Sequence, residues 1–278
     1  MRLRIILSLI IAAVLLSTAP AFPGEKDIVI FVTRMGGDSA SAQPYIDKFL
    51  RYVESTTGWP ADSAKGSFQM TKDKAQAFVA SDEPGIGIMD PPLYFEFRKA
   101  WKLQAILQVE SKDLVSERLH IVVKDPAFNS LADLKGKRLW TTLADFPKYV
   151  SKIVLNDQAD AAAHFDLKKV GQALKGVRGV IRGDCEATIL DDEQFAEAKK
   201  ITGGQDLRAI VSSRQLPPIP VVVFGAALSA ADKKTLVSTL TRMCGADKGR
   251  EICEEMHIGR FTPVNLSLFS EIQKRYDE

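Results

Sequence analysis

The stretch Ser130-Leu-Ala-Asp-Leu-Lys-Gly-Lys-Arg-Leu-Trp140 decides how the middle of the chain folds. Ser130 is a residue type that caps helices, and the two leucines after it are spaced to anchor a short helical turn. Gly136 is expected to end that turn, because glycine adopts a positive φ without steric cost. Residues 137–142 then have the composition of a strand. The stretch therefore predicts a helical turn, a glycine turn and a strand, which is typical of α/β proteins.

Short apolar segments alternate with longer amphipathic ones on both sides of this stretch, and this pattern indicates α/β architecture. The expected strands are 27–33, 66–70, 85–89, 103–109, 119–123, 137–142, 168–170, 187–190, 207–212 and 221–224. The expected helices are 42–57, 72–80, a helix opening at 90–92, 147–155, 172–177 and 191–200, and the chain from residue 230 onward is expected to be helical. Two similar units predict two lobes, the first from residues 22–114 and 220–278 and the second from 115–219. Crossovers are expected near 112–123 and 213–223.

Residues 1–21 have the pattern of a cleavable signal peptide. Arg2 and Arg4 form a positively charged start, residues 5–16 are almost entirely apolar, and Ala19-Pro-Ala21 supplies small residues before a cleavage site. The apolar run is too short to cross about 30 Å of hydrocarbon as a helix. We therefore expect export to the periplasm and cleavage after Ala21. An uncleaved membrane anchor is the alternative.

The charge balance argues against two classes of partner. The chain has 37 Lys and Arg residues and 35 Asp and Glu residues, and Arg2 and Arg4 leave with the signal peptide. Binding to nucleic acid or to an anionic membrane requires a basic excess, which this chain lacks. We expect a small-molecule ligand, no nucleic-acid partner and a monomer.

The three cysteines raise the question of pairing in an oxidising compartment. Cys244 and Cys253 lie in two expected helical segments joined by the short link 245–249. This spacing predicts a disulfide that stabilises the fold by about 2–3 kcal/mol. Cys185 is then left over as a small buried apolar residue. The alternative is that all three thiols are free.

No pattern for catalysis or metal binding emerges from the sequence. His120, His164 and His257 lack metal-ligand spacing, and there is neither a Gly-x-Ser-x-Gly turn nor a phosphate-binding glycine loop. The carboxylates on both sides of Cys185 disfavour its thiolate form. We predict no metal, no cofactor and no enzymatic activity.

Three patterns together resemble the phosphate/phosphite/phosphonate-binding family of ABC-transporter periplasmic proteins. The first is the stretch that begins at Ser130. The second is an acidic loop, a small apolar strand and an aspartate, which occurs at 82–90 and again at 183–191; the third is Gly259-Arg-Phe-Thr-Pro-Val264 before a last helix with Tyr276. The resemblance implies the type II periplasmic binding fold, in which each lobe is a mixed sheet flanked by helices and the ligand cleft lies between the lobes. It also implies capture of a solute for the membrane permease of an ABC importer.

In that fold the ligand meets strand carboxyl ends and helix amino ends. On this basis the candidate ligand-binding residues are Arg34, Ser39, Asp90, Tyr94, Thr141, Thr142, Asp145 and Asp191. Family members that bind phosphonates usually have a loop of serine and glycine at the place that residues 141–147 occupy here. This chain has Thr141-Thr-Leu-Ala-Asp-Phe-Pro147 instead, in which the two threonines provide hydroxyl donors.

The aspartates Asp90, Asp145 and Asp191 leave two interpretations open. They either cap the helices that follow them, or they face the cleft with Arg34 and select a zwitterion or amine. In the second case they would reject a dianion, because like charges about 4 Å apart repel by about 4 kcal/mol. Tyr94, four residues after Asp90, would then stack on an organic ligand or an amine. The alternative function is a periplasmic ligand sensor or partner-binding protein on the same scaffold.

Overall fold

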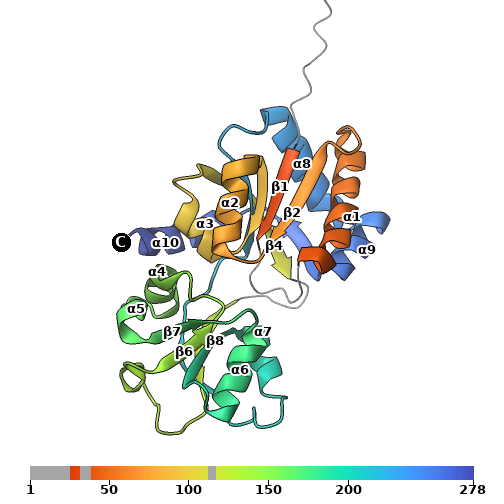
Figure 1. Cartoon of the computed structure of the whole chain (residues 1–278). Helices are drawn as coiled ribbons and strands as arrows, with labels where there is room; N and C mark the ends of the chain where they lie inside the picture. Colours follow the sequence, from red (N-terminus) through yellow and green to blue (C-terminus); the bar gives the residue numbers. More distant parts are fainter. Residues whose placement is uncertain (1–25, 32–38, 112–116) are drawn as a thin grey trace, which may run out of the picture.

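The structure is a computed structural model that describes residues 26–31, 39–111 and 117–278. They form two α/β lobes, one above the other in Figure 1. The predicted signal peptide with its cleavage site, and Arg34, lie outside the described residues. Within the described ranges, no helix is both long and apolar enough to cross a membrane.

Lobe 1 contains a mixed six-stranded sheet in the order β11-β4-β10-β3-β1-β2. β1 pairs in parallel with β2 and β3, whereas β10 runs antiparallel to both β3 and β4, and β11 is antiparallel to β4. The strands are β1 Lys26–Phe31, β2 Ala64–Gln69, β3 Ile86–Met89, β4 Leu103–Ser111, β10 Ile219–Phe224 and β11 Ile258–Thr262.

Helices cover both faces of this sheet because its strands are apolar on both sides. In β1, Ile28 and Ile30 join one hydrophobic cluster while Val29 and Phe31 join another, as the two-residue period of a strand requires. The first cluster includes helices α1 Ser39–Thr57, α8 Ala230–Met243 and α9 Asp247–Glu255. The second includes α2 Lys72–Asp82, α3 Pro91–Phe97 and α10 Leu266–Asp277. Figure 1 shows the two groups of helices on opposite sides of the sheet.

Lobe 2 contains a five-stranded sheet in the order β7-β6-β8-β5-β9. Its strands are β5 Leu119–Val123, β6 Arg138–Thr141, β7 Asp166–Lys169, β8 Ala187–Asp191 and β9 Arg208–Ser212. Helices α6 Ala173–Arg182 and α7 Asp192–Ala198 pack on one face. The other face contacts α4 Pro147–Tyr149, the π-helix η2 Val150–Val154 and α5 Ala161–His164. The predicted mixed sheets flanked by helices are confirmed in both lobes.

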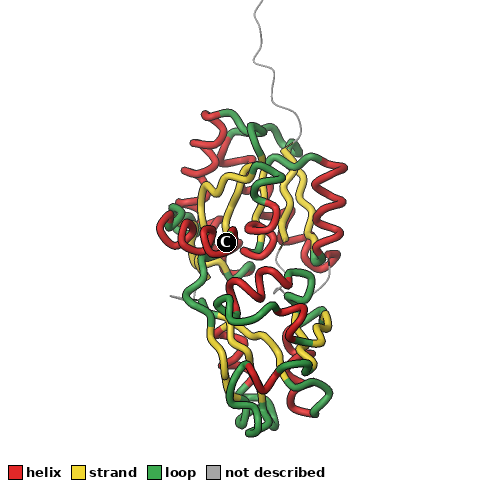
Figure 2. The backbone as a smooth tube through the Cα atoms, turned by 90° about the vertical axis from the view of Figure 1, so that its left-hand side faces the viewer, coloured by secondary structure: helices red, strands yellow, loops and turns green. Residues whose placement is uncertain are grey.

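Two segments connect the sheets, one between β4 and β5 and the other between β9 and β10. They run side by side where Glu117 and Leu216 form an antiparallel bridge, in which Leu216 N donates to Glu117 O at 2.8 Å. The lobes also meet through one hydrophobic cluster with members in both sheets. Figure 2 shows the boundary between the lobes from the side. The exact lobe boundaries stay a prediction.

The stretch that begins at Ser130 forms the predicted elements with one correction. A 3₁₀ turn, η1 Ala132–Leu134, is followed by Gly136 at φ 71° and then by β6. Ser130 does not cap the turn. Its hydroxyl instead donates to the carboxylate of Asp133 at 2.9 Å, and that carboxylate also accepts the backbone N–H groups of Asn129 at 2.9 Å and Ser130 at 2.8 Å. These hydrogen bonds, with that of Asn129 first, hold the pKa of Asp133 below its usual value.

The expectation of helix throughout the chain after residue 230 is wrong. Residues Ile258–Thr262 form strand β11, on the edge of the lobe 1 sheet. Cross-strand contacts with β4 stabilise it: Arg260 pairs with Glu110 at 2.6 Å, and Thr262 Oγ1 donates to Glu110 at 2.8 Å. Because Glu110 is distant in sequence, the local pattern did not predict this strand. The helix expected at 147–155 is likewise one α-turn followed by the π-helix η2.

The predicted disulfide between Cys244 and Cys253 is confirmed. Their Cα atoms are 5.6 Å apart, and the bond ties the end of α8 to α9. Cys185 is buried and not disulfide-bonded. The alternative of three free thiols is therefore excluded.

We expect reduction of this disulfide to lower the melting temperature by about 5–10 °C. The bond closes a loop with a sequence separation of 9, which corresponds to about 2.7 kcal/mol of unfolded-state entropy. Differential scanning calorimetry of residues 22–278, with and without a phosphine reductant, measures the effect. The double variant Cys244→Ala/Cys253→Ala is the control, because its melting temperature should not respond to the reductant. Equal melting temperatures for the oxidised and reduced parent would contradict the prediction.

Candidate functional site

A small pocket lies where the two lobes and their connecting segments meet. Its volume is about 20 Å³, which is room for one water molecule, so entry of an organic solute requires movement of the lobes or of the lining side chains. Lobe 1 contributes Asp90, Pro91 and Pro92, the connecting segments contribute Glu117 and Leu216, and lobe 2 contributes Leu119, Thr142, Leu143, Tyr149, Ile189 and Gln194.

Asp90 lies at the pocket because it directly follows β3. Its backbone N–H donates to Phe31 O at 2.8 Å, and Pro91 starts α3 at the next residue. The side chain is 1% exposed and does not cap α3. Helix capping therefore does not explain this aspartate.

Asp191 does cap a helix. Its carboxylate accepts Gln194 N at 2.7 Å, and the Gln194 amide oxygen accepts Asp191 N at 3.3 Å, which together form a capping box at the start of α7. Asp191 does not line the pocket, whereas Gln194 does. Because the amide oxygen of Gln194 is bound to Asp191, its NH₂ group is the part available to donate to a solute.

The two threonines after β6 have different positions. Thr141 is 1% exposed, and its hydroxyl accepts Leu143 N at 3.1 Å, so it shapes the loop. Thr142 lines the pocket. Of the two predicted hydroxyl donors, Thr142 is therefore the one placed to meet a solute.

Asp145 is not the helix cap that the sequence suggested. Pro147 occupies the first position of α4, so the cap position falls on Phe146. The Asp145 carboxylate instead pairs with Lys169 of β7, the neighbouring strand. Asp145 does not line the pocket, and its side chain fixes the loop to the sheet.

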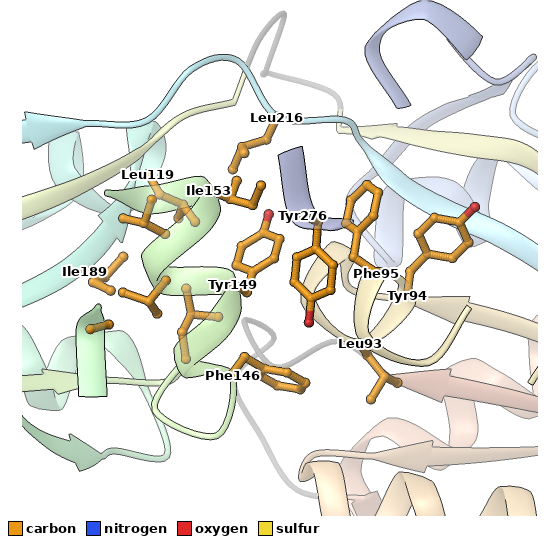
Figure 3. Packing of buried hydrophobic residues seen from close by; sticks show 14 of the residues in the cluster. Leu93, Tyr94, Phe95, Leu119, Phe146, Tyr149, Ile153, Ile189, Leu216 and Tyr276 are labelled. Atoms are coloured by element: carbon orange, nitrogen blue, oxygen red, sulfur yellow. The ribbon is translucent and has the colours of Figure 1, made fainter. Parts of the chain in front are cut away.

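Tyr94 lies in the core of lobe 1 and does not line the pocket. Its ring packs edge-on against Phe95 at 5.1 Å and Phe269 at 5.8 Å between ring centroids, and burial raises the pKa of its phenol. The tyrosine at the pocket is Tyr149, whose ring lies 6.5 Å from Phe95 and 6.4 Å from Tyr276. Figure 3 shows Tyr94 beyond Phe95 as seen from Tyr149.

Two predicted residues lie at or beyond the edge of the described chain. Arg34 is outside it, and Ser39 begins α1 with a side chain that is not described. Conversely, Glu117, Tyr149 and Gln194 line the pocket but were not among the predicted site residues. The Asp-x-x-Gln spacing of a capping box could have pointed to Gln194. Glu117 lies in a connecting segment and had no such signal.

Cys185 has the environment of an inert thiol. Burial, followed by the charge of Glu186, raises its pKa to about 11, so it is protonated at neutral pH. Among the residues that the structure describes, no group of three or more His, Cys, Asp or Glu side chains is arranged to hold a metal ion.

A family model described as "ABC transporter, phosphonate, periplasmic substrate-binding protein" matches residues 38–269. The chain belongs to this family. It is thus a periplasmic substrate-binding protein of the phosphonate ABC-transporter family, and membership implies a small-molecule ligand and an ABC permease as partner. The predicted family and importer role are confirmed.

Solved structures agree on the fold of this substrate-binding protein. XAC2383 from Xanthomonas citri, bound to chloride, is 14% identical with a TM-score of 0.74, covering 90% of this chain and 97% of that one. The binding protein component of an ABC phosphonate transporter, PA3383 from Pseudomonas aeruginosa, is 13% identical with a TM-score of 0.67, covering 92% and 88%. PhnD1 from Prochlorococcus marinus, in complex with methylphosphonate, is 13% identical with a TM-score of 0.66, covering 91% and 97%. The two-lobed type II fold is confirmed. A search of curated proteins found no match.

Proposed function

We propose that this substrate-binding protein captures a small phosphonate or related oxyanion in the pocket between its lobes and presents it to the permease in the closed form. One observation supports this site: both lobes and both connecting segments contribute residues to the lining of the pocket. A solute bound there touches both lobes at once. Its binding free energy therefore favours closure, and opening about the connecting segments releases it.

Several lining residues offer groups that can bind such a solute. The Thr142 hydroxyl and the Gln194 NH₂ group donate hydrogen bonds to anionic oxygens, and Tyr149 and the leucines pack against an organic substituent. Asp90 is an acceptor for N–H or O–H groups of the solute. Arg34 and Ser39 remain in the proposed site on the sequence prediction alone, Tyr94 and Asp145 lie outside the pocket lining, and Thr141 and Asp191 take part by shaping its walls.

A zwitterion or an amine is the second candidate solute. The ionisable lining residues other than Tyr149 are two carboxylates, Asp90 and Glu117, and none of the described lining residues is Lys, Arg or His. Carboxylate oxygens accept charge-assisted hydrogen bonds from ammonium groups. This observation favours a solute with at least one cationic or N–H donor group.

The proposal includes several finer statements. Lobe 1 comprises residues 22–114 and 220–278 and lobe 2 comprises residues 115–219, and the signal peptide is cleaved after Ala21. The mature protein is a monomer that needs no cofactor, does not bind nucleic acid and has no enzymatic activity. The lobe bounds rest on the two sheets, the cleavage site on the N-terminal pattern, the lack of nucleic-acid binding on the charge balance and the lack of enzymatic activity on the high pKa of the Cys185 thiol.

A thermal-shift experiment on residues 22–278 tests the proposal. The panel contains phosphate, phosphite, methylphosphonate, a sulfonate, an amino acid and a quaternary amine. A ligand at 100 times its Kd adds about 2.7 kcal/mol, which raises the melting temperature by about 5–10 °C. We expect this shift with methylphosphonate or phosphite and its reduction in Thr142→Val and Gln194→Leu.

Thr241→Val, on the exposed side of α8, is the matched control and should keep the full shift. A shift with only the amine or amino acid would favour the second candidate solute. A full shift in both pocket variants would contradict the pocket as the binding site, and no shift with any compound would contradict the proposal.

A further inference from the structure

The ammonium group of Lys72 lies between the lobes and contacts both. Lys72 begins α2 in lobe 1 and pairs there with Glu96 of α3. Its Nζ also donates to the backbone oxygen of Asp145 in lobe 2 at 3.2 Å. The same nitrogen lies 5.7 Å from the ring centroid of Phe97 in lobe 1 and 5.3 Å from that of Phe146 in lobe 2. One cation thus has two partners in each lobe.

The partners in lobe 2 are held in place without Lys72. The Asp145 carboxylate pairs with Lys169 of β7, and Phe146 N donates to Leu143 O at 2.9 Å. The Phe146 ring is 1% exposed and meets Phe31 of lobe 1 edge-on at 6.3 Å. The carbonyl and the ring therefore form a preorganised acceptor for a cation from the other lobe.

Lys72 is anchored in lobe 1, and its contacts with lobe 2 can form and break as the lobes close and open. The side chains of Lys72 and Glu96 are 22% and 24% exposed, so this pair within lobe 1 is less screened than a surface pair and holds the ammonium group at the boundary between the lobes. When the lobes separate, Lys72 keeps Glu96 and Phe97 but loses Asp145 and Phe146. Water can then hydrate the ammonium group, which lowers the cost of opening. An apolar side chain at this position would lack that compensation.

We propose that Lys72 is a positioning residue for the closed form, which it stabilises through the Asp145 carbonyl and the Phe146 ring. The contact between the lobes does not depend on the identity of the solute. Only the effect of Lys72 on solute retention rests on the proposed function. Since a bound solute leaves after the lobes open, Lys72 would then slow dissociation.

The test compares Lys72→Met with Lys74→Met in ligand-free residues 22–278. Methionine keeps the length of the side chain and removes the charge, and Lys74 is exposed two residues further along α2. Spin labels at Lys234→Cys on α8 and Lys175→Cys on α6, both exposed sites, report the distance between the lobes. Cys185→Ala removes the remaining free thiol.

We expect Lys72→Met to lower the closed-to-open ratio about tenfold, equivalent to about 1.4 kcal/mol, and Lys74→Met to leave it unchanged. Identical distance distributions in the two variants would overturn the proposal. So would a parent protein whose labels show only the open separation.

A double-mutant cycle with Phe146→Leu separates action between the lobes from action within lobe 1. If Lys72 acts on Phe146, the two substitutions are not additive in the closed-to-open ratio. Additive effects would mean that the Phe146 ring is not a partner of Lys72, and the proposal, which requires that ring, would be wrong. With methylphosphonate as the probe, Lys72→Met should raise the dissociation rate by up to the same tenfold. Failure of methylphosphonate to bind the parent would count against the proposed solute and not against Lys72, because the distance measurement uses no solute.

Discussion

Replacing Phe95 with alanine is expected to lower the free energy of unfolding by about 4 kcal/mol. Phe95 is fully buried and lies at the centre of an aromatic group that joins α3, α4 and α10. Its ring centroid is 6.5 Å from Tyr149, 6.3 Å from Phe269 and 6.0 Å from Tyr276. Alanine removes the ring of α3 from its contacts with α4 and α10, and Figure 3 shows that Tyr149 belongs to the other lobe. The cavity therefore weakens both lobe 1 and the boundary between the lobes.

Thermal unfolding of residues 22–278 measures this effect, with an expected fall in melting temperature of about 8–16 °C. Phe95→Leu should recover more than half of the loss, because leucine refills most of the volume. Tyr45→Ala is the matched control: Tyr45 is 46% exposed, so its truncation should cost less than about 1 kcal/mol. If Phe95→Ala and Tyr45→Ala had similar melting temperatures, the central role of Phe95 would be refuted.

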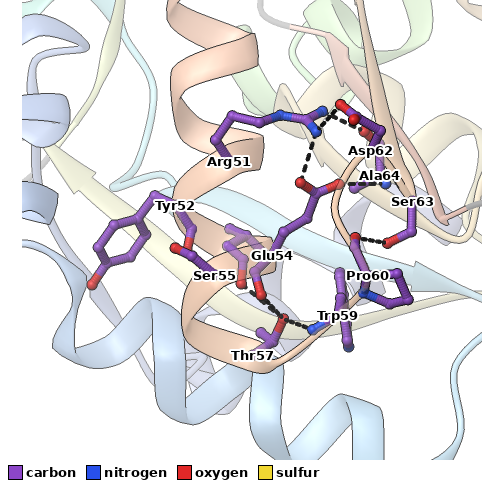
Figure 4. A network of polar contacts seen from close by, with 11 residues as sticks. Arg51, Tyr52, Glu54, Ser55, Thr57, Trp59, Pro60, Asp62, Ser63 and Ala64 are labelled. Carbon is purple, nitrogen blue, oxygen red and sulfur yellow. Dashed lines mark hydrogen bonds and ion pairs between the residues drawn. The ribbon is translucent and has the colours of Figure 1, made fainter.

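The second large effect is expected for Glu54→Leu, at about 3 kcal/mol of lost stability. Glu54 of α1 is 3% exposed, accepts the buried backbone N–H of Ala64 at 2.8 Å and pairs with Arg51 at 2.8 Å. Figure 4 shows the glutamate between the helix and the start of β2. Leucine leaves the Ala64 N–H buried without its acceptor and removes one carboxylate from Arg51.

Chemical denaturation of the parent and variant measures the difference. Glu54→Gln should cost about half as much, because the amide oxygen still accepts the Ala64 N–H. Glu251→Leu is the matched control, since Glu251 is 66% exposed in its pair with Lys48 and should contribute less than about 1 kcal/mol. Equal losses for Glu54→Leu and Glu251→Leu would contradict the prediction.

Much of the fold was predictable because the signals are local. The continuous apolar run Ile28-Val-Ile-Phe31 predicted a strand, and the structure buries this strand on both faces. The turn at Gly136 follows from the chemistry of a single residue. The short separation of Cys244 and Cys253 was enough to predict their disulfide. By contrast, β11 depends on Glu110 of another strand, and no pattern within residues 258–262 shows that partner.

The site was less predictable, because its residues meet only in three dimensions. The sequence alone determined the family, the two α/β units, and that Asp90 and Thr142 follow strands of different lobes. Only the tertiary structure decided that Asp145 pairs with Lys169, that Tyr94 packs in the core while Tyr149 lines the pocket, and that Lys72 reaches across to lobe 2. Secondary structure and capping follow from interactions over a few residues, which a sequence displays. The partner of a charged or aromatic side chain is set by distances between elements far apart in the chain, and these exist only once the sheets have formed and the lobes have packed.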